Sequence, residues 1–340
     1  MNSGGRIFVA GHLGLVGSAL VRRLQRQGYT DLILRTHAEL DLTNETAVRK
    51  FFAEEHPAYV FLAAAKVGGI LANDSSPVDF LRENLLIQNN VIHEAYTNGV
   101  ERLLFLGSSC VYPKNAPQPI REEYLLSGPL EPTNRAYALA KISGIEMCWA
   151  YNRQYGTRSI AAMPTNLYGP NDNYNSHTSH VVPALIKKFH QAKLHHARTV
   201  TIWGSGSPRR EFLFSDDAAD ACIWLMNLSE ASIGQIMRSK GPPLVNVGWG
   251  RDLTIRELAC IVGEIVGVDC ELVFDGSKPD GTPRKLLDTT LLNSLGWHPN
   301  TSLREGIRMT YEAYCRDVAS DPSSAHHAKQ DQIGSYKAGT

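Results

Sequence analysis

Two short segments of the sequence carry side chains that together can move protons at a carbonyl group. Ser108 and Cys110 lie in the first segment, and Tyr137 and Lys141 lie four positions apart in the second. Residues at that spacing on a helix point the same way, so the Lys141 ammonium can lower the pKa of the Tyr137 phenol from about 10. With Ser108 as a second hydrogen-bond donor, the phenol can protonate a carbonyl oxygen while a hydride reaches the carbon.

Cys110 is one side chain more than a hydride transfer requires. A thiolate is both a base and a nucleophile, so a cysteine at this place indicates a second reaction at the same site. The alternative is a small buried apolar residue, which is the usual role of a free cysteine. The position of Cys110 two residues after Ser108 favours the chemical role.

A glycine-rich turn near the N-terminus predicts a dinucleotide-binding site. Gly11, Gly14 and Gly17 follow an apolar run at residues 7–10 and open an amphipathic segment. Glycines allow the tight turn and the close approach of the pyrophosphate to the backbone at the helix N-terminus. The spacing is G-x-x-G-x-x-G, and a purely structural turn is the alternative that the strand–turn–helix context disfavours.

The end of the second expected strand indicates which dinucleotide binds. An acidic residue there holds the ribose 2′-hydroxyl of NAD, whereas a cation favours the 2′-phosphate of NADP. Residues 32–34 are followed by Arg35, with no acid at the strand end. We therefore expect NADP(H), with Asp41 and Leu42 placed to meet the adenine. A solvated surface charge is the alternative for Arg35.

The elements that must position these residues alternate between short apolar runs and longer amphipathic ones, which is typical of βαβ units. Strands are predicted over residues 7–10, 32–34, 59–63, 102–106 and 159–163, and helices over 15–27, 45–55, 77–99 and 136–155. The predicted fold class is α/β, a Rossmann-type doubly wound parallel sheet with a smaller, discontinuous α/β substrate domain. The two long helices, 77–99 and 136–155, are a candidate homodimer surface.

The domain boundaries follow from a change in composition after Met163, where a loop rich in Asn, Pro and Gly begins. We expect a dinucleotide-binding domain over residues 1–170 and about 212–250, where ligands meet the carboxyl ends of the strands. The substrate-binding domain is expected over about 171–211 and 251–318. Residues 319–340 are poor in apolar side chains and are expected to form a mobile tail.

The composition limits the classes of function. Of the 340 residues, 34 are Lys or Arg and 34 are Asp or Glu, so nucleic acid and membrane surfaces are not expected partners. The six cysteines form no Cys-x-x-Cys pair, and no metal site is expected. No signal-peptide core or apolar stretch of about 20 residues is evident, so we expect a cytoplasmic protein.

With these motifs, the chain resembles the extended short-chain dehydrogenases/reductases and, among them, the GDP-L-fucose synthase family. The resemblance covers about residues 6–314. Its most specific motifs are AAAKVGGI (63–70), LFLGSSC (104–110), MPTNLYGP (163–170), SHVVPAL (179–185), WGSG (203–206), RREF (209–212) and KPDGTPRK (278–285). Several such motifs in the same order are very unlikely to arise by chance.

The resemblance implies epimerisation at C3 and C5 of GDP-4-keto-6-deoxy-D-mannose, followed by NADPH-dependent reduction of the C4 ketone. It implies Cys110 as the base and His180 as the acid of the epimerisation, beside Ser108, Tyr137 and Lys141. It also implies the residues that contact each ligand. The expected dinucleotide contacts are Gly11, His12, Leu13, Gly14, Leu15, Val16, Gly17, Arg35, His37, Asp41, Leu42, Leu106, Gly107, Ser108, Ser109, Lys141, Pro164, Thr165, Asn166, Leu167 and His180. The expected GDP-sugar contacts are Lys188, Trp203, Arg210 and Asp280.

The chain departs from the family at two positions near the expected 2′-phosphate. The best-known bacterial members carry Arg at the positions of Leu13 and His37, which leaves Arg35 as the cation of this region. We therefore expect a narrower preference for NADPH than in those members.

Three other functions compete with this interpretation. Sugar-nucleotide 4,6-dehydratases carry Asp and Glu at the positions of Ser109 and Cys110, so that reaction lacks its acid–base pair here. A nucleotide-sugar 4-epimerase is the second choice, since it needs no Cys110. A dinucleotide-sensing regulatory module is the non-enzyme alternative, and such modules tend to lose the Tyr or Lys that this chain retains.

Overall fold

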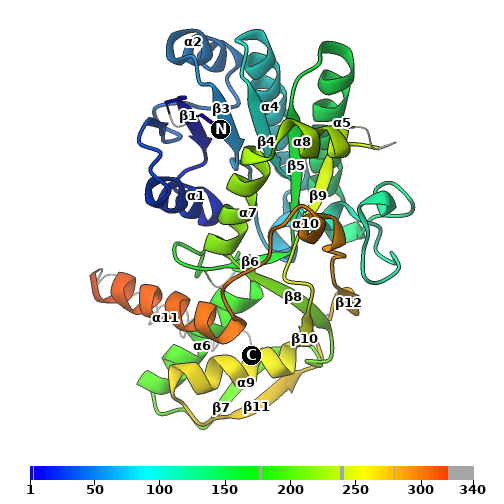
Figure 1. The fold of residues 1–340 in the computed structure, drawn as a ribbon. Coiled ribbons are helices and arrows are strands. Elements are labelled where there is room, and N and C mark those ends of the chain that lie inside the picture. Colours follow the sequence, from blue (N-terminus) through cyan, green and yellow to red (C-terminus); the bar gives the residue numbers. More distant parts are fainter. Residues whose placement is uncertain (3, 176–177, 238–240, 279, 321–340) are drawn as a thin grey trace.

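The largest sheet consists of six parallel strands in the order β2-β1-β3-β4-β5-β9 (Figure 1). The structure is a computed structural model, and it describes residues 1–2, 4–175, 178–237, 241–278 and 280–320. The strands are β1 (Ile7–Ala10), β2 (Leu32–Ile33), β3 (Tyr59–Leu62), β4 (Arg102–Leu106), β5 (Ser159–Pro164) and β9 (Leu244–Val247). All pairs are parallel, which confirms the predicted doubly wound fold class.

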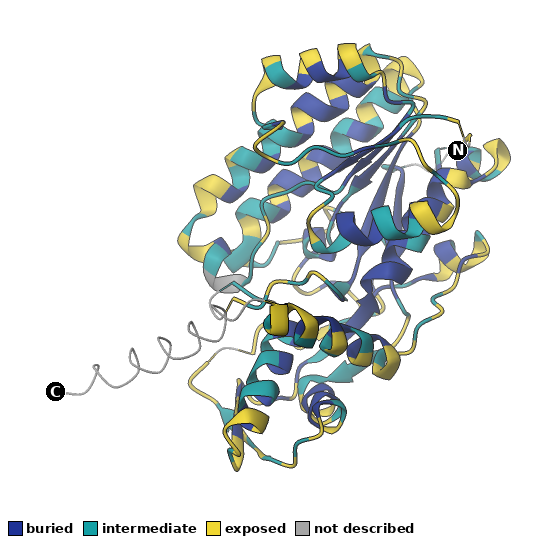
Figure 2. Ribbon diagram, turned by 90° about the vertical axis from the view of Figure 1, so that its left-hand side faces the viewer, coloured by how far each residue is buried: buried dark blue, intermediate teal, exposed yellow. Residues whose placement is uncertain are grey.

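Helices cover both faces of this sheet, so its strands are apolar on both sides. Phe8 and Ala10 belong to one buried cluster, while Ile7 and Val9 belong to the other. The first face packs against α2 (Glu45–Glu55), α4 (Pro77–Thr97) and α5 (Arg135–Tyr155). The second face packs against α1 (Leu15–Arg26), α7 (Ser215–Asn227), α8 (Glu230–Met237) and α10 (Thr290–Ser294). Figure 2 shows the buried strands between these partly exposed helix layers.

A smaller unit lies beyond the carboxyl ends of the large sheet. Its core is formed by α6 (Val181–Leu194), α9 (Ile255–Val266), α11 (Leu303–Ser320), and strands β7 (Thr199–Trp203), β8 (Arg209–Phe214) and β11 (Glu271–Asp275). Strand β8 pairs with β6 (Asn166–Tyr168), β10 (Asp252–Thr254) and β12 (Arg284–Lys285), and β7 pairs with β11. This unit occupies the lower part of Figure 1.

Short elements lie in the connections after β3 and β4. They are α3 (Ile70–Ser75) and the 3₁₀ turns η1 (Ser109–Val111), η2 (Glu122–Tyr124) and η3 (Pro132–Asn134). Helix α11 continues to Ser320, so Ala319 and Ser320 are helical, and the rest of the expected tail, residues 321–340, lies outside the described residues. Among the helices that the structure describes, none is both long enough and apolar enough to span a bilayer.

Candidate active site

The glycine turn between β1 and α1 leaves an open cradle at the N-terminus of α1. Gly11 has a φ of 81°, and a Cβ there would lie 2.8 Å from Cα of Ala64, which follows β3. Gly14 is the N-cap of α1, no side chain caps its free N–H groups, and its first turn has no acidic residue. A Cβ on Gly17 would collide with the carbonyl of Gly11. Free amides at a helix N-terminus attract anions, so this cradle fits a dinucleotide pyrophosphate.

The side chains between these glycines have different surroundings. Leu13 is 68% exposed, while Leu15 and Val16 begin α1 and are half-buried. In the part of the chain that the structure describes, Nδ1 of His12 is buried without a hydrogen-bond partner. The exposed Leu13 offers only apolar surface at the place where a cation would help to bind a phosphate.

The guanidinium of Arg35 is already engaged by the protein. It forms an ion pair with Glu55 at the end of α2, and Nη1 donates a hydrogen bond of 2.9 Å to the carbonyl of Leu34. The group also lies 5.9 Å from the centroid of the Phe51 ring. The contact of Arg35 with a 2′-phosphate stays a prediction. The phosphate would have to bind Arg35 while the guanidinium is also paired with Glu55.

One acidic residue, Glu39, lies in the turn that follows β2, beyond the segment from which the cofactor was predicted. Oε2 of Glu39 accepts hydrogen bonds from the amide of Thr36 at 2.7 Å and from its hydroxyl at 2.8 Å. These bonds lower the pKa of Glu39, and the charges of Arg35 and His12 lower it further. The carboxylate belongs to a turn that folds back onto the strand end, which its position in the sequence does not reveal.

The other residues expected near the adenosine surround this turn. His37 is exposed, and its Nδ1 lies 3.9 Å from a carboxylate oxygen of Asp41. Asp41 also accepts hydrogen bonds from the amide and hydroxyl of Thr43, and these lower its pKa. Leu42 is buried, with 8% of its surface exposed, so it can contribute little surface to a ligand.

The predicted proton-transfer residues come together between the end of β4 and the first turns of α5. Oγ of Ser108 caps η1 by accepting a hydrogen bond of 3.4 Å from the amide of Cys110. Nζ of Lys141 is buried, donates to the carbonyl of Leu106 at 2.8 Å, and lies 5.8 Å from the centroid of the Tyr137 ring. Phe80 packs edge-on against that ring from α4.

Burial, and not Lys141, dominates the proton affinity of Tyr137. Burial raises the pKa of Tyr137 well above its usual value, and charge on Cys110 raises it further, while the Ser108 hydrogen bond opposes both. Burial likewise lowers the pKa of Lys141 to about 8. The expected lowering of the Tyr137 pKa by Lys141 was therefore wrong, because loss of hydration around the phenolate outweighs the nearby cation. A phenol with a raised pKa stays protonated, which is the form that donates a proton.

Among the nearby groups, Lys285 most strongly favours ionisation of the Cys110 thiol. Burial raises the pKa of Cys110, whereas the Lys285 charge, the Ser108 hydrogen bond and the Lys141 charge lower it, in that order. Burial lowers the pKa of Lys285, and Cys110 counteracts this effect. Two cations thus act on the thiol, Lys141 from α5 and Lys285 from β12.

The pairing of β8 with β12 places two cations beside Asp252 and two others on the opposite face of the strands. Arg210 lies beside Lys285 in the parallel register, and Arg209 lies beside Arg284. Arg209 and Arg284 are both ion-paired with the buried carboxylate of Asp252. Since successive side chains point to opposite faces of a strand, Arg210 and Lys285 face away from Asp252. Arg210 lowers the pKa of Lys285 because the two positive charges repel each other. An anion bound beside both groups would relieve this repulsion.

His180 is the N-cap residue of α6, at the end of the loop that follows β6. Its side chain is exposed, yet nearby protein atoms reduce the hydration of the ring and lower its pKa. The Lys285 charge lowers the pKa further. The Lys285 charge therefore acts on both His180 and Cys110. The structure brings the predicted acid and the predicted base to the same cation.

Two of the four predicted GDP-sugar contacts, Lys188 and Trp203, line a groove of the smaller unit. Trp203 is 51% exposed, with Nζ of Lys188 5.4 Å and Nζ of Lys278 5.6 Å from its ring. A groove beside Trp203 and Lys188 continues along α6 and β7 past Gln191. Asp280 holds a turn beside this groove: one carboxylate oxygen accepts a hydrogen bond of 2.7 Å from the amide of Ser205 and the other accepts one of 2.8 Å from its hydroxyl. Its contact with the substrate stays a prediction.

The loops expected beside the nicotinamide are held by neighbouring strands. Pro164 ends β5, and the amide of Thr165 donates to the carbonyl of Val247 at 3.0 Å. A Cβ on Gly107 would collide with the sulfur of Met163. The remaining predicted contacts of these loops are the buried Ser109 and the half-buried Leu106, Asn166 and Leu167.

Comparison with known proteins agrees with this architecture. The model of the NAD dependent epimerase/dehydratase family matches residues 7–238. GDP-L-fucose synthase 1 of Arabidopsis thaliana is 58% identical over 313 residues, which cover 92% of this chain and 94% of that protein. This chain belongs to the NAD dependent epimerase/dehydratase family, in the group of the GDP-L-fucose synthases.

Two solved structures place this member of the family among nucleotide-sugar enzymes. A GDP-mannoheptose C4 reductase from Campylobacter jejuni with NADP bound has a TM-score of 0.84 and 44% identity, over 92% of this chain and 99% of that one. A GDP-L-fucose synthetase from Naegleria fowleri bound to NADP also has a TM-score of 0.84, with 26% identity, over 94% and 96% of the two chains.

Two charged residues of this epimerase/dehydratase site were absent from the sequence-based set of contacts. Lys285 closes the motif KPDGTPRK, so its position was noticed but its role was not. Glu39 lies four residues after Arg35 and becomes relevant only through the turn at Thr36. The basic end of a specific motif could have indicated a role for Lys285, whereas nothing in the sequence marked Glu39.

Proposed function

We propose that this protein converts GDP-4-keto-6-deoxy-D-mannose to GDP-L-fucose, by epimerisation at C3 and C5 and then reduction of the C4 ketone. The names of relatives such as the Arabidopsis thaliana synthase support this proposal. The observation that carries it is the position of Cys110 in one electrostatic cluster with Ser108, Tyr137, Lys141 and Lys285. A reductase alone requires no thiol in this cluster.

In the epimerisation, Cys110 acts as the base and His180 as the acid. Protons on C3 and C5 are acidic because both carbons flank the C4 ketone, and the enolate places its charge on the C4 oxygen. Tyr137 and Ser108 stabilise that oxyanion by hydrogen bonds. Lys285 and Lys141 favour the thiolate of Cys110 against the effect of burial. Inversion requires a second group on the opposite face, and His180 returns the proton there.

In the reduction, Tyr137 donates a proton to the C4 oxygen and Ser108 holds that oxygen in place. Lys141, held by its bond to the carbonyl of Leu106, supplies positive charge near the phenol. NADPH, when bound, supplies the hydride. The glycine cradle at Gly11–Gly17 would hold the pyrophosphate of this cofactor, since it combines free amides with close backbone approach. The Leu106–Ser109 and Pro164–Leu167 segments would complete the cofactor site.

The substrate lies between the two predicted domains, at residues 1–170 with about 212–250 and at about 171–211 with 251–318. These bounds need two changes, because α10 packs on the large sheet while β6 and β8 pack in the smaller unit. Arg210 and Lys285 form a dication that fits the diphosphate or the developing oxyanion. Lys188 and Trp203 border the groove that receives the nucleotide. Asp280 holds the turn at Ser205, and we expect the substrate to meet the outer surface of that turn.

The decisive experiment supplies the keto-sugar nucleotide and NADPH in deuterium oxide. One NADPH is expected to be consumed per substrate, and the product is expected to be GDP-L-fucose with deuterium at C3 and C5. Consumption of NADPH without deuterium at these carbons would exclude the epimerisation. No consumption of NADPH would exclude the reduction, as a 4-epimerase or a regulatory module predicts.

A second candidate is reduction at C4 without epimerisation. The name of the Campylobacter jejuni structure and the raised pKa of Cys110 favour it, since a thiol that stays protonated cannot act as a base. The same deuterium experiment separates the two functions.

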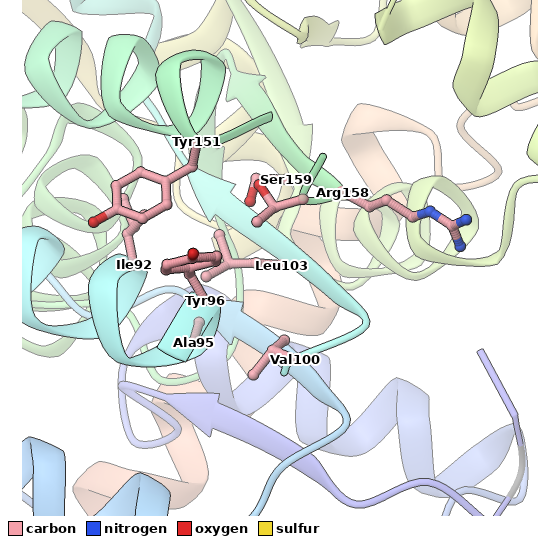
Figure 3. Close-up of a pocket in the computed structure, with 9 residues that line it drawn as sticks. Ile92, Ala95, Tyr96, Val100, Leu103, Tyr151, Arg158 and Ser159 are labelled. Carbon is pink, nitrogen blue, oxygen red and sulfur yellow. The ribbon is translucent and has the colours of Figure 1, made fainter. Parts of the chain in front are cut away.

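The α4 and α5 pair is the proposed homodimer surface. Tyr96 and Tyr155 are 37% and 48% exposed and stack with ring centroids 4.3 Å apart. Figure 3 shows Tyr96 and Tyr151 among the residues that line a small hollow at the start of β4 and β5. Cys110 follows the opposite, carboxyl end of β4. Exposed aromatic faces of this kind are typical of protein interfaces. Light scattering is expected to give twice the mass of the chain, and Tyr155→Glu is expected to give the monomer mass.

The setting proposed for the protein is the cytoplasm. All six cysteines are free, and Cys110 must remain reduced to act as a base. Measurement of its distribution in fractionated cells tests this expectation.

A further inference from the structure

Glu211, in the middle of β8, is a fully buried carboxylate that the mechanism above does not use. Its side chain has 0% of its surface exposed. Burial raises its pKa, and hydrogen bonds from backbone amides oppose that rise. A buried carboxylate costs free energy unless each oxygen is satisfied, so its partners indicate what it does.

The two carboxylate oxygens bind two different segments of the chain. Oε1 accepts a hydrogen bond of 2.6 Å from the amide of Gly250, and Oε2 accepts one of 3.0 Å from the amide of Leu287. Gly248 leaves room for the carboxylate, because a Cβ there would collide with Oε1. The side chain thus clamps the β9–β10 connection and the segment that follows β12.

The clamp at Leu287 holds the end of a very short strand. Strand β12 consists of Arg284 and Lys285 only, and at its start the carbonyl of Pro283 accepts a hydrogen bond of 2.8 Å from the amide of Arg209. The amide of Leu287, two residues after Lys285, is bound by Glu211. The same strand β8 therefore fixes β12 on both sides of Lys285.

The backbone carbonyl of Glu211 has a separate task. It accepts hydrogen bonds from Oγ1 of Thr165 at 3.2 Å and from Nδ2 of Asn166 at 2.8 Å, in the loop that the proposed function assigns to the cofactor. The Thr165 hydroxyl also lowers the pKa of the Glu211 carboxyl, so the side chain shares this one contact with the loop. The bond from Asn166 to the backbone carbonyl does not involve the side chain, and a substitution of the side chain leaves it in place.

We propose that Glu211 is a positioning residue that holds Lys285 at the distance from Cys110 required for the thiolate to form. This inference rests on the proposed function for the role of Cys110 as a base. Glu211 acts only through the amide of Leu287 and the strand that precedes it, and it does not contact the reacting atoms.

The test is Glu211→Gln, which keeps the volume but replaces one acceptor oxygen by an NH₂ group. One backbone amide then faces a donor instead of an acceptor. Deuterium exchange at C3 and C5 is expected to fall by about 10–100-fold, as for a buried donor that loses its partner. The KM for NADPH is expected to change by less than about 2-fold, because the carbonyl bonds remain.

A second measurement follows the thiol itself in the ligand-free protein. The rate at which iodoacetamide alkylates Cys110, followed by mass spectrometry of its peptide, reports the thiolate fraction at each pH. Glu211→Gln is expected to raise the pH of half-maximal alkylation, because Lys285 no longer supports the thiolate as well. In a Lys285→Gln background, Glu211→Gln is expected to cause no further rise.

The matched control is Asp217→Asn, another buried carboxylate that accepts hydrogen bonds from backbone amides. Asp217 is 7% exposed and binds the amides of Asn300 and Thr301, away from Lys285. The control is expected to lower thermal stability without a change in the alkylation profile of Cys110. If Glu211→Gln does not fold, Gly248→Ala displaces the carboxylate while its charge is kept, and the same upward shift is expected.

Two results would overturn the inference. One is an unchanged alkylation profile in a folded Glu211→Gln protein. The other is a further rise of the same size in the pH of half-maximal alkylation when Glu211→Gln is added to the Lys285→Gln background. Absence of deuterium exchange in the wild type would instead reject the proposed function, and the alkylation profile would still test the link from Glu211 to Cys110.

Discussion

Lys285 of the smaller unit supplies the largest favourable influence on ionisation of Cys110, which lies in η1 after β4 of the large sheet. The two residues are 175 positions apart, by subtraction of their numbers. The site is therefore complete only when the smaller unit is packed beyond the carboxyl ends of the sheet strands.

Lys285→Gln is expected to make the thiol harder to ionise. Burial raises the pKa of Cys110 and the Lys285 charge lowers it, so removal of that charge raises the pKa. The pH at which deuterium exchange reaches half its maximum is expected to rise by about 1 unit. Arg284→Gln is the control, since Arg284 is paired with Asp252, and a similar shift in that variant would contradict the specific role of Lys285.

Tyr137→Phe is expected to abolish reduction while cofactor and GDP-sugar binding remain nearly unchanged. The raised pKa keeps the phenol protonated, so the wild type has a proton donor that Phe lacks. Loss of a positioned acid is expected to reduce kcat by about 10²–10⁴-fold. NADPH oxidation in the steady state measures this loss, and near-normal turnover would show that another group donates the proton.

Cys110→Ser is expected to stop exchange at C3 and C5, while slow reduction of the unepimerised ketone continues. The unperturbed pKa of a thiol is about 8.5, and a serine hydroxyl is a much weaker acid that forms no useful base. His180→Gln is expected to permit exchange but to impair inversion. The measurements are deuterium content and product configuration, and undiminished exchange in the Cys110 variant would remove it from the mechanism.

Glu39→Gln is expected to strengthen the preference for NADPH, and Arg35→Ala is expected to weaken it. Glu39 is an anion at the end of β2, and its lowered pKa keeps it ionised at neutral pH. It therefore repels a 2′-phosphate and can accept a hydrogen bond from a 2′-hydroxyl. The ratio of kcat/KM for NADPH and NADH measures both effects. Equal changes for the two cofactors in either variant would show that the residue does not meet the ribose.

Asp172→Asn is expected to stabilise the protein more at pH 8 than at pH 5. Burial raises the pKa of Asp172 to about 7, and its Oδ2 has no hydrogen-bond partner among the described residues. The folded state therefore holds a proton that the unfolded state has lost, so stability falls as the pH rises from about 4 to about 7. Asn removes this dependence, and thermal unfolding at both pH values measures it.

The control for this experiment is Asp216→Asn. Asp216 forms an ion pair of 2.5 Å with Arg22, so its amide variant is expected to be less stable than the wild type at pH 8. A stabilising effect in both variants would show that the result is unrelated to the burial of Asp172.

The sequence by itself determined the parallel sheet and the segments that carry the proton-transfer residues. The predicted ranges 7–10, 102–106 and 45–55 coincide with β1, β4 and α2. Such segments are recognisable because a strand buried on both faces is continuously apolar, while a covering helix is amphipathic. Tyr137 and Lys141 lie together for a local reason, the repeat of the α-helix.

Only the tertiary structure decided which charges act on which groups. Arg35 proved to be ion-paired with Glu55, Glu39 folds back to the end of β2, and Lys285 reaches Cys110 from another unit. The pKa of Tyr137 likewise depends on how completely the fold removes water from its ring. Burial and electrostatic contacts arise between residues distant in sequence, so residue types and spacing do not reveal them.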